Sequence, residues 1–496
     1  MSALRSRRIV MWLCIAALVL SVLPLYAISL YNHPYYDDYG FSAAVHQAWR
    51  QTGSLGAVLR QAVQSARNVR ATWQGTYTGT LLSNLQPGIF SEKLYFIGSF
   101  ALITAFLLCF GAFFRTLFHR VFGMPKETSV SLSCLLLFLS VQLLPDVGEA
   151  FYWFNGGVGN IFIYSLMALA LTLGYFLYCA KGAWRVGLLT AALALLMVLL
   201  GGGSYGGGLM GLCLFAGLVC WMFARRSPRK WLFIALWALF LACFLYSAFA
   251  PGNGVRARIV GYSVSPVKAI AQALYYGMAQ FGGYLTLPVL GASLLCAPAM
   301  AKAAKQSCFS FAHPWLALLG AYLLYCTQFV PPLYSIASIG GGRIVNTYYI
   351  SFIALWFAWL YVFIGWACKR FAPAFEPSAA LRRGLALFAA CLVAVGCLGF
   401  KRADDVLLGA QNLSGASAAL SIVTCEAKTY DGEMSAREAL LNDETQPVVT
   451  LKPLTATPAV LMDDLLTPDA LYDARPSLCL YYDKQAVVIE GREDAQ

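Results

Sequence analysis

Charged residues are scarce in this chain, and acidic residues are scarcest in its first 400 positions. Only 12% of the 496 residues are charged, whereas 59% are hydrophobic. Residues 1–400 contain 27 Lys and Arg but 7 Asp and Glu, and residues 401–496 contain 8 and 16. This composition excludes an ordinary soluble domain, because so much apolar surface cannot be buried in one water-facing core.

Motifs for metal and nucleophile chemistry are also missing. The sequence has no Cys-x-x-Cys or Cys/His spacing typical of zinc, and no GxSxG or HExxH motif. The segment GGGSYGGG at 201–208 lacks the Lys-Ser/Thr ending of a phosphate-binding loop, so we interpret it as a tight turn or a close-packing surface. The basic residues lie in short loops beside apolar runs, which argues against nucleic acid as a partner.

Long apolar runs dominate the chain instead. Many reach about 20 residues, the length that crosses the hydrocarbon core of a bilayer. We therefore predict an all-α polytopic membrane protein with about 11 transmembrane helices. The expected spans are 9–30, 94–114, 128–145, 157–180, 186–203, 207–224, 231–250, 269–299, 314–337, 345–367 and 384–400.

Basic residues predict the orientation of these spans. RSRR precedes the first run, whose apolar core is too long for a cleaved signal peptide, so we expect a retained anchor with a cytoplasmic N-terminus. The segments RTLFHR, KGAWR, ARRSPRK, AKAAK and CKR…LRR then all lie in the cytoplasm, in agreement with the positive-inside rule. Residues 1–400 would form a transmembrane domain whose first outer loop is 31–93.

The first outer loop is long enough for structure of its own. Residues 43–50 and 55–70 place Ala, Val and Leu at helical spacing, with Arg and Gln on the other face. This pattern predicts two short helices that lie on the membrane surface.

Residues 401–496 differ from the rest of the chain. They contain the β-favouring pieces QPVVTLKPL and QAVVIE between turn residues, which predicts a small extracytoplasmic α+β domain. Cys425 and Cys479 would lie there in an oxidising compartment, either as a disulfide or as two free thiols.

The stretch HPYYDDYGFS at 33–42 places Asp37 beside Asp38 just after the first span. Adjacent carboxylates repel, so the pKa of at least one should be raised unless a cation compensates. One of them would act as a general base, or both would hold a divalent cation such as Mg²⁺ or Mn²⁺. The alternative is a solvated Asp pair in a turn. We predict Asp38 as the base.

Aromatic residues accompany this pair. Tyr39 and Trp73 have flat faces and polar tips that suit a sugar ring, although such residues also suit the membrane interface. Trp153 and Asn155, in the Gly-rich AFYWFNGGVGN, belong either to a binding loop or to a tight helix connection. His33 is expected to be a local hydrogen-bonding group.

Arginines come from other outer loops. Arg256 and Arg258 follow the seventh span in PGNGVRARIV, and Arg343 precedes the tenth in SIGGGRIVNTYY. Arginine binds phosphate oxygens in a bidentate manner, and glycines let the backbone approach a ligand. For Arg256 and Arg258 the alternative is contact with lipid headgroups. Arg343 is the stronger indication of a phosphate site, because an outer Arg runs against the usual charge bias.

This arrangement resembles the GT-C glycosyltransferases, polytopic enzymes that use polyprenyl-phosphate-linked sugars. They share a cytoplasmic N-terminus, one span, and a long outer loop that opens with an acidic pair. DDYGFS, TWQG at 72–75, YWFNGGVGN at 152–160 and PGNGVR at 251–256 more closely resemble a bacterial membrane family of unknown function that is itself similar to GT-C enzymes. The resemblance covers most of residues 1–400.

The resemblance implies a glycosyltransferase of the bacterial cytoplasmic membrane. It would move a sugar from a polyprenyl-phosphate donor to a glycan, lipid or protein acceptor at the outer face. Asp37 or Asp38 would match the GT-C acidic position, as the base toward the acceptor or as a metal ligand. Arg256, Arg258 and Arg343 would hold the donor phosphate.

Two alternative functions remain, a transporter or flippase for lipid-linked sugars and a sugar polymerase. Transporters typically place ionisable groups at mid-membrane, often in symmetric halves. Here the predicted spans from the second onward carry almost no charge at their centres. A polymerase would share the outer-loop arginines, but the early acidic pair argues against it.

Overall fold

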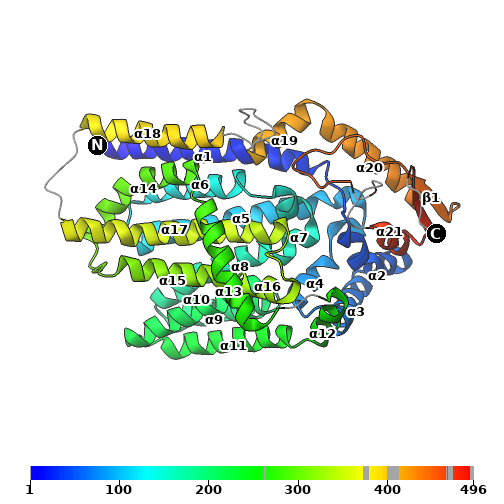
Figure 1. Ribbon diagram of the computed structural model, residues 1–496, viewed down its shortest axis with the longest axis horizontal. Coiled ribbons are helices and arrows are strands. Elements are labelled where there is room, and N and C mark those ends of the chain that lie inside the picture. The colour runs from blue at the N-terminus through cyan, green and yellow to red at the C-terminus, as the bar shows by residue number, and fades with distance from the viewer. Residues whose placement is uncertain are drawn as a thin grey trace.

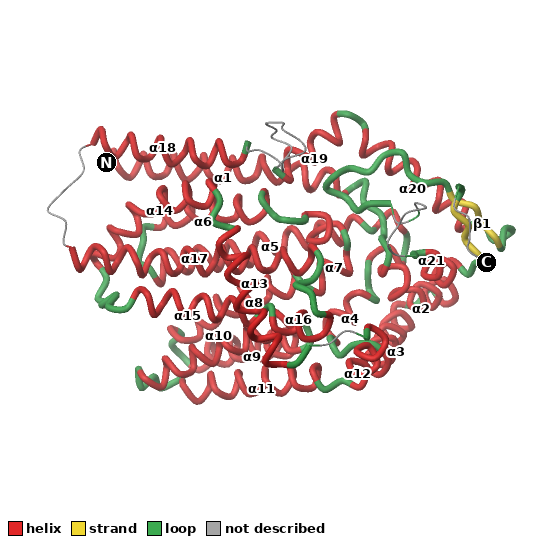
Figure 2. The backbone as a smooth tube through the Cα atoms, in the orientation of Figure 1, coloured by secondary structure: helices red, strands yellow, loops and turns green. Residues whose placement is uncertain are grey.

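Helices form almost all of the structure, a computed structural model that describes residues 2–261, 264–371, 379–398, 413–464, 466 and 473–491. The long helices lie side by side as a bundle, with the N-terminus at the left end in Figure 1 and the C-terminus at the right. The described strands are two short segments near the C-terminus (Figure 2). The predicted all-α polytopic class is confirmed.

Most of the bundle helices follow one another along the chain with short connections, whereas a long segment separates α1 from α5. The bundle helices are α1 (Ser2–Ser29), α5 (Phe96–Arg115) with the π-helical turn η3 (Thr116–Val121), α6 (Lys126–Gln142), α8 (Ile161–Cys179), α9 (Ala183–Gly201), α10 (Tyr205–Ala224), α11 (Lys230–Ala248), α13 (Pro266–Gly283), α14 (Leu287–Gln306), α15 (Pro314–Thr327), α17 (Gly342–Phe371) and α18 (Ala379–Cys397). Shorter helices between them are η4 (Gly148–Tyr152), α7 (Phe154–Gly159), α12 (Pro251–Val260) and α16 (Val330–Ile336).

Ten helical segments within the described ranges are long and apolar enough to cross a membrane. Every predicted span except 128–145 overlaps one of them. That exception is α6, a helix of 17 residues that packs against α1, α5, α14 and α17 inside the bundle. The chain is therefore a multi-pass α-helical membrane protein.

The prediction of a single helix over 269–299 is wrong. The chain breaks between α13 and α14, and of these two α14 is among the ten candidate spans. Gly282 and Gly283 end α13, and Pro288 lies in the first turn of α14. Proline is tolerated there because its missing N–H would have no partner in the helix anyway. The Gly-Gly and Pro signals were visible in the sequence.

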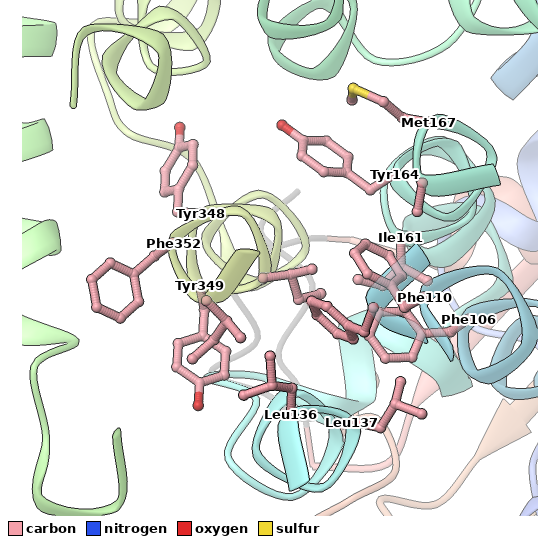
Figure 3. Packing of buried hydrophobic residues seen from close by; sticks show 14 of the residues in the cluster. Phe106, Phe110, Leu136, Leu137, Ile161, Tyr164, Met167, Tyr348, Tyr349 and Phe352 are labelled. Atoms are coloured by element: carbon pink, nitrogen blue, oxygen red, sulfur yellow. The ribbon is translucent and has the colours of Figure 1, made fainter. Parts of the chain in front are cut away.

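Aromatic and branched side chains fill the centre of the bundle. Figure 3 shows side chains of α5, α6 and α8, among them Phe106, Leu136 and Ile161, around α17 with its Tyr349. All four are at most 3% exposed. In a bilayer the lipid is as apolar as leucine, so close packing and interhelical hydrogen bonds stabilise such a bundle more than exclusion of water does.

The glycine-rich segment 201–208 lets α9, α10 and α11 approach one another closely. A Cβ atom on Gly201 would lie 2.4 Å from the Cβ atom of Cys243 in α11, so no larger residue fits there. Ser204 caps α10 by accepting a hydrogen bond from the Gly207 amide at 3.2 Å. The interpretation of this segment as a tight turn and packing surface is confirmed.

The segment between α1 and α5 folds into three short helices and two turns. They are α2 (Asp37–Thr52), α3 (Leu55–Thr72), α4 (Tyr77–Ser83), η1 (Pro87–Ile89) and η2 (Glu92–Leu94). The first two extend the predicted helices at 43–50 and 55–70. Gly53, with a left-handed φ of 59°, ends α2 and returns its N–H to the Trp49 carbonyl, as glycine commonly does after a helix.

The C-terminal segment, meaning the described residues from 413 onward, packs on this first loop. It contains α19 (Ser414–Val423), α20 (Glu426–Asn442), β1 (Val448–Leu451), α21 (Arg475–Tyr482) and β2 (Ala486–Ile489). The strands fall within the two β-favouring pieces and pair in parallel, with Val448 opposite Ala486. Tyr39 of α2 is buried in one core with Leu451 and Tyr481, so α2 completes the hydrophobic core of this segment. The predicted boundary at 400/401 lies outside the described residues.

Charged pairs connect the C-terminal segment to the first loop and hold it together. The His33 Nε2 atom lies 2.9 Å from Oδ1 of Asp431. Burial lowers the pKa of His33, but the hydrogen bonds and charges of Asp431 and Glu92 outweigh burial and raise the pKa to about 9. Arg437 binds both carboxylate oxygens of Asp464, at 3.0 and 2.8 Å.

Of the two alternatives predicted for Cys425 and Cys479, the structure contains the free thiols. Cys425 is exposed and Cys479 is partly buried.

Candidate functional site

A cavity of about 690 Å³ opens among the first loop, the short helices and the N-terminal ends of α10 and α17. The charged side chains on its wall, among the described residues, are Asp37, Glu149, Arg256 and Arg343. Glycines of the 201–208 and 338–343 segments form part of the wall, so backbone amides lie close to the cavity. The cavity thus combines acids, bases and accessible backbone in one place.

Asp37 and Asp38 occupy the first turn of α2, where a negative charge suits the helix dipole. Successive helical residues point about 100° apart. As a result Asp37 lines the cavity, whereas Asp38 is fully buried behind it. The pKa of Asp37 is raised by burial, an effect that the charges of Arg343 and Arg256 partly offset.

Asp38 is held by three donors. Its Oδ2 atom accepts hydrogen bonds from the Tyr95 hydroxyl at 2.5 Å and from the backbone N–H of Tyr35 at 3.0 Å. Its Oδ1 atom accepts one from the backbone N–H of Asn155 at 2.9 Å. Burial raises the pKa of Asp38 to about 7 although these three bonds favour the ionised form. Asp38 therefore ties the start of α2 to α7 and to the start of α5.

The residue before the acidic pair has an uncommon backbone. Tyr36 has φ 40° and ψ −101°, in a region that residues with a side chain rarely adopt. Such conformations persist where the surrounding structure enforces them, and they cluster at functional sites. Tyr36 itself lines the cavity.

Arg256 projects from α12 into the cavity. Its Nη1 atom donates to Oε1 of Gln74 at 2.8 Å, and its guanidinium carbon lies 5.2 Å from the ring centroid of Trp73. Its buried Nε atom has no hydrogen-bond acceptor among the residues that the structure describes. Burial and the nearby charge of Arg343 lower the pKa of Arg256, which indicates that an anionic ligand between the two arginines would be favourable.

Arg343 lies on the same cavity wall at the start of α17. Its guanidinium carbon is 4.7 Å from the ring centroid of Trp153, and Nη1 is 3.7 Å from Oε2 of Glu149. The indole Nε1 of Trp153 is buried and has no acceptor in the described part of the chain. Asn155 faces the cavity as well, and its Oδ1 atom accepts from Ser83 at 2.5 Å.

The motifs TWQG and PGNGVR contact each other beside the cavity. The Gly75 amide donates to Oδ1 of Asn253 and to the hydroxyl of Tyr205, both at 3.1 Å. A Cβ atom on Gly252 would lie 2.5 Å from the Trp73 amide nitrogen, so the start of α12 packs directly on the end of α3. This contact positions Trp73 and Arg256 together.

Two of the predicted site residues lie away from the cavity wall. Arg258 is exposed on the outer side of α12, and Tyr39 is buried against Tyr481 with ring centroids 5.2 Å apart. The structure brings together Asp37, Trp73, Trp153, Asn155, Arg256 and Arg343 around the cavity, with Asp38 directly behind it.

Sequence reasoning missed Glu149, Gln74 and Tyr205 as cavity residues. Glu149 is one of only 7 acidic residues in the first 400 positions, which was a usable signal. Gln74 and Tyr205 lie inside the noted TWQG and GGGSYGGG segments, but nothing in the sequence showed that these segments meet.

The carboxylates of Asp37 and Asp38 do not face the same space. Both Asp38 oxygens accept hydrogen bonds from the protein, and its side chain is sealed from solvent. Among the described residues no three His, Cys, Asp or Glu side chains gather in a way that would hold a metal ion. A cation in the cavity would meet Asp37 and not Asp38.

No family model, curated protein or solved structure matches this chain. The fold and the site therefore define its class from its own residues: a multi-pass helical membrane protein with a charge-lined cavity beside the ends of its helices.

Proposed function

We propose that this protein is a GT-C-like membrane glycosyltransferase that transfers a sugar from a polyprenyl-phosphate donor to a glycan, lipid or protein acceptor. The observation that carries the proposal is a single cavity that holds the carboxylate of Asp37 and the guanidinium groups of Arg256 and Arg343. Two buried N–H groups at this cavity, Arg256 Nε and Trp153 Nε1, have no acceptor within the described ranges. A phosphosugar would supply oxygen acceptors for both.

The charged groups suit each part of a glycosyl transfer. Asp37 takes the proton of the acceptor hydroxyl, whose oxygen attacks the anomeric carbon of the sugar. The bond from that carbon to the phosphate oxygen breaks, and the polyprenyl phosphate leaves with the electron pair. Arg256 and Arg343 stabilise the charge that develops on it. Because burial raises the pKa of Asp37, its carboxylate is a stronger base than an exposed one.

We assign the base to Asp37, in place of the Asp38 expected from the sequence. Asp38 is fully buried and engaged with Tyr35, Tyr95 and Asn155, so it has no path to an acceptor hydroxyl. Its role in the proposed reaction is to position Asp37 against the Trp153–Asn155 segment.

We further propose that the cavity faces the outer side of the bacterial cytoplasmic membrane. Along α17, Arg343 borders the cavity at one end, whereas Lys369 and Arg370 lie in the last turn at the other. Basic residues collect on the cytoplasmic side of membrane proteins, so the end with Lys369 and Arg370 would be cytoplasmic. The C-terminal segment would then be extracytoplasmic, as would the cavity.

The test is transfer of a labelled sugar in membranes that contain the full-length protein. Polyprenyl-phosphate sugars with a radiolabel are added, and labelled glycan, lipid and protein products are separated. We expect D37N to lower the transfer rate by about 10²–10⁴-fold, the usual contribution of a general base. The control E490Q changes an exposed carboxylate of the C-terminal segment and should transfer at the wild-type rate.

The outcomes separate the proposed function from its alternatives. A D37N variant that is inserted normally and transfers sugar at the wild-type rate would overturn the assignment of the base. Movement of labelled donor across the membrane without any new glycosidic product would instead identify a transporter or flippase. A growing polymer of donor-derived units would identify a polymerase.

A further inference from the structure

One side of α3 exposes an apolar stripe that no part of the described protein covers. Leu55, Leu59 and Val63, one helical turn apart, are 62%, 57% and 43% exposed. Val58 and Ala62 on the adjoining side are buried against α2. Helix α3 therefore has two apolar sides, one packed on the protein and the other directed outward.

Only basic charges accompany this stripe. Arg60 and Arg67 on α3 and Arg258 on the neighbouring α12 are all exposed. Residues 39–91 and 150–371 contain no Asp or Glu, so neither helix carries a compensating negative charge. An apolar stripe bordered by arginines is the pattern of helices that lie in the headgroup layer of a membrane.

Contacts with α11 indicate where this surface lies relative to the bilayer. The candidate membrane span α11 ends at Ala248, and α12 begins at Pro251. The Nη2 atom of Arg70 on α3 donates to the Tyr246 carbonyl at 3.1 Å, and the Arg70 guanidinium carbon is 3.9 Å from the Tyr246 ring centroid. Figure 1 shows α3 and α12 next to each other at the right-hand end of α11. Both helices therefore lie where a membrane span leaves the bilayer.

Further exposed apolar side chains lie on α12 and at the end of α11. Phe249, between α11 and α12, is 79% exposed, and Ile259 of α12 is 66% exposed. Water contact at these positions would be unfavourable, whereas the boundary between headgroups and acyl chains accommodates them. Exposed apolar side chains therefore occur on α3, on α12 and at the end of the candidate membrane span α11.

We infer that Leu55, Leu59, Val63, Arg60, Arg67 and Arg258 form an anionic-lipid-binding surface, with the leucines and valine at the acyl boundary and the arginines on headgroup phosphates. Each basic side chain near a membrane adds about fivefold to the affinity for anionic lipid. The same helix α12 directs Arg256 into the cavity and Arg258 to this surface. Anionic lipids are therefore concentrated directly beside the cavity.

The experiment measures which lipid touches α3. The full-length L59W variant is reconstituted into nanodiscs of equimolar phosphatidylcholine and phosphatidylglycerol, in which one of the two lipids carries brominated acyl chains that quench indole fluorescence. The signal of the 12 native tryptophans is subtracted with the protein that lacks the substitution. We expect quenching of the introduced indole by both lipids, and quenching by brominated phosphatidylglycerol to be about fivefold stronger.

Charge variants connect this preference to the arginines. R60Q/R67Q/R258Q on the L59W background should remove the preference for phosphatidylglycerol and keep the quenching by phosphatidylcholine. R60K/R67K/R258K, which keeps the charge, should retain the preference and reports on correct folding. The control R50Q changes an exposed arginine that pairs with Glu444 and should also retain it.

Three results would overturn the inference. Absence of quenching by both lipids would mean that α3 lies away from the bilayer. Equal quenching by both lipids in the L59W protein would mean that the surface does not select anionic lipid. A preference that survives the glutamine substitutions would mean that other groups produce it.

Discussion

The stretch 33–42 borders two regions that differ in whether their charged groups are paired within the protein. Toward the C-terminal segment, His33 meets Asp431 at 2.9 Å, and Arg437 meets Asp464 at 2.8 Å. Toward the cavity, Arg256 has an N–H group for which the described residues provide no acceptor. Charges that are neutralised within the protein hold segments together, whereas donors left unpaired beside a cavity indicate a place for a ligand.

The largest expected effect is on the side of the C-terminal segment. R437A removes one partner of a buried ion pair whose side chains are 9% and 4% exposed, and it takes the guanidinium away from the buried carboxylate of Asp464. We expect a loss of about 3–5 kcal/mol in the free energy of unfolding. Detergent-induced unfolding of the purified protein in mixed micelles measures it. R343A, at the half-exposed cavity arginine, should cost less than about 1 kcal/mol, and equal losses would contradict the comparison.

The second effect is a dependence of the free energy of unfolding on pH, and we attribute it to His33. Its pKa in the folded protein, about 9, exceeds the ordinary value of 6.5. The protonated ring therefore stabilises the protein fully below pH 6.5, and this contribution is lost as the pH rises through about 9. The contribution is about 3 kcal/mol, since one pKa unit corresponds to about 1.4 kcal/mol.

The measurement for His33 is the free energy of unfolding between pH 6 and pH 10. H33Q should be less stable than the wild type at the acidic end and should show a flatter pH profile. A wild-type profile that H33Q reproduces in parallel would mean that other groups cause the slope.

The third effect sharpens the contrast between the two neighbouring aspartates. In D38N an amide replaces a carboxylate that accepts from Tyr35, Tyr95 and Asn155, so one buried donor loses its acceptor. We expect a loss of about 2 kcal/mol in stability at neutral pH. D37N, at a side chain on the cavity wall, should leave stability within about 0.5 kcal/mol of wild type. The unfolding assay in micelles compares them, and a larger loss in D37N would reverse their assigned roles.

The smallest effect concerns one N–H group. W153F removes the indole Nε1–H, which has no acceptor among the described residues, and keeps an aromatic face beside Arg343. We expect unchanged stability and a roughly fivefold rise in KM for the sugar donor, because one hydrogen bond to the ligand is worth about 1 kcal/mol. Steady-state transfer kinetics measure it. An unchanged KM together with lower stability would show that the indole N–H has a structural role.

The class of the fold could be predicted because apolar run length follows directly from bilayer thickness. The break within 269–299 was missed because total apolarity conceals a Gly-Gly pair and a proline when hydropathy alone is considered. The predicted span 128–145 extends past the C-terminal end of α6 at Gln142. The Nε2 atom of Gln142 donates a hydrogen bond to the Ser21 carbonyl of α1 at 3.0 Å. Such interhelical contacts are set by the partner and leave no mark on the helix itself.

The candidate site could be predicted in its parts and not in its arrangement. Motifs at 37–42, 72–75, 152–160 and 251–256 contribute to one region of the structure because helices of the bundle return them to the same end. The choice between Asp37 and Asp38 depends on how α2 is rotated about its axis, and that rotation is set by α21 and the core around Tyr39. No local pattern in HPYYDDYGFS contains this information.

The docking of the C-terminal segment on α2 also determines when, during synthesis, the cavity can be completed. Synthesis proceeds from the N-terminus, so α2 emerges long before its partner α21. His33 and Asp431 are separated by 398 positions, and Tyr39 waits still longer for Tyr481. Until α21 has been made, the wall of the cavity that carries Asp37 lacks this support. A product that stops before α21 would therefore contain the ten candidate membrane spans of the described ranges and still lack a finished cavity wall.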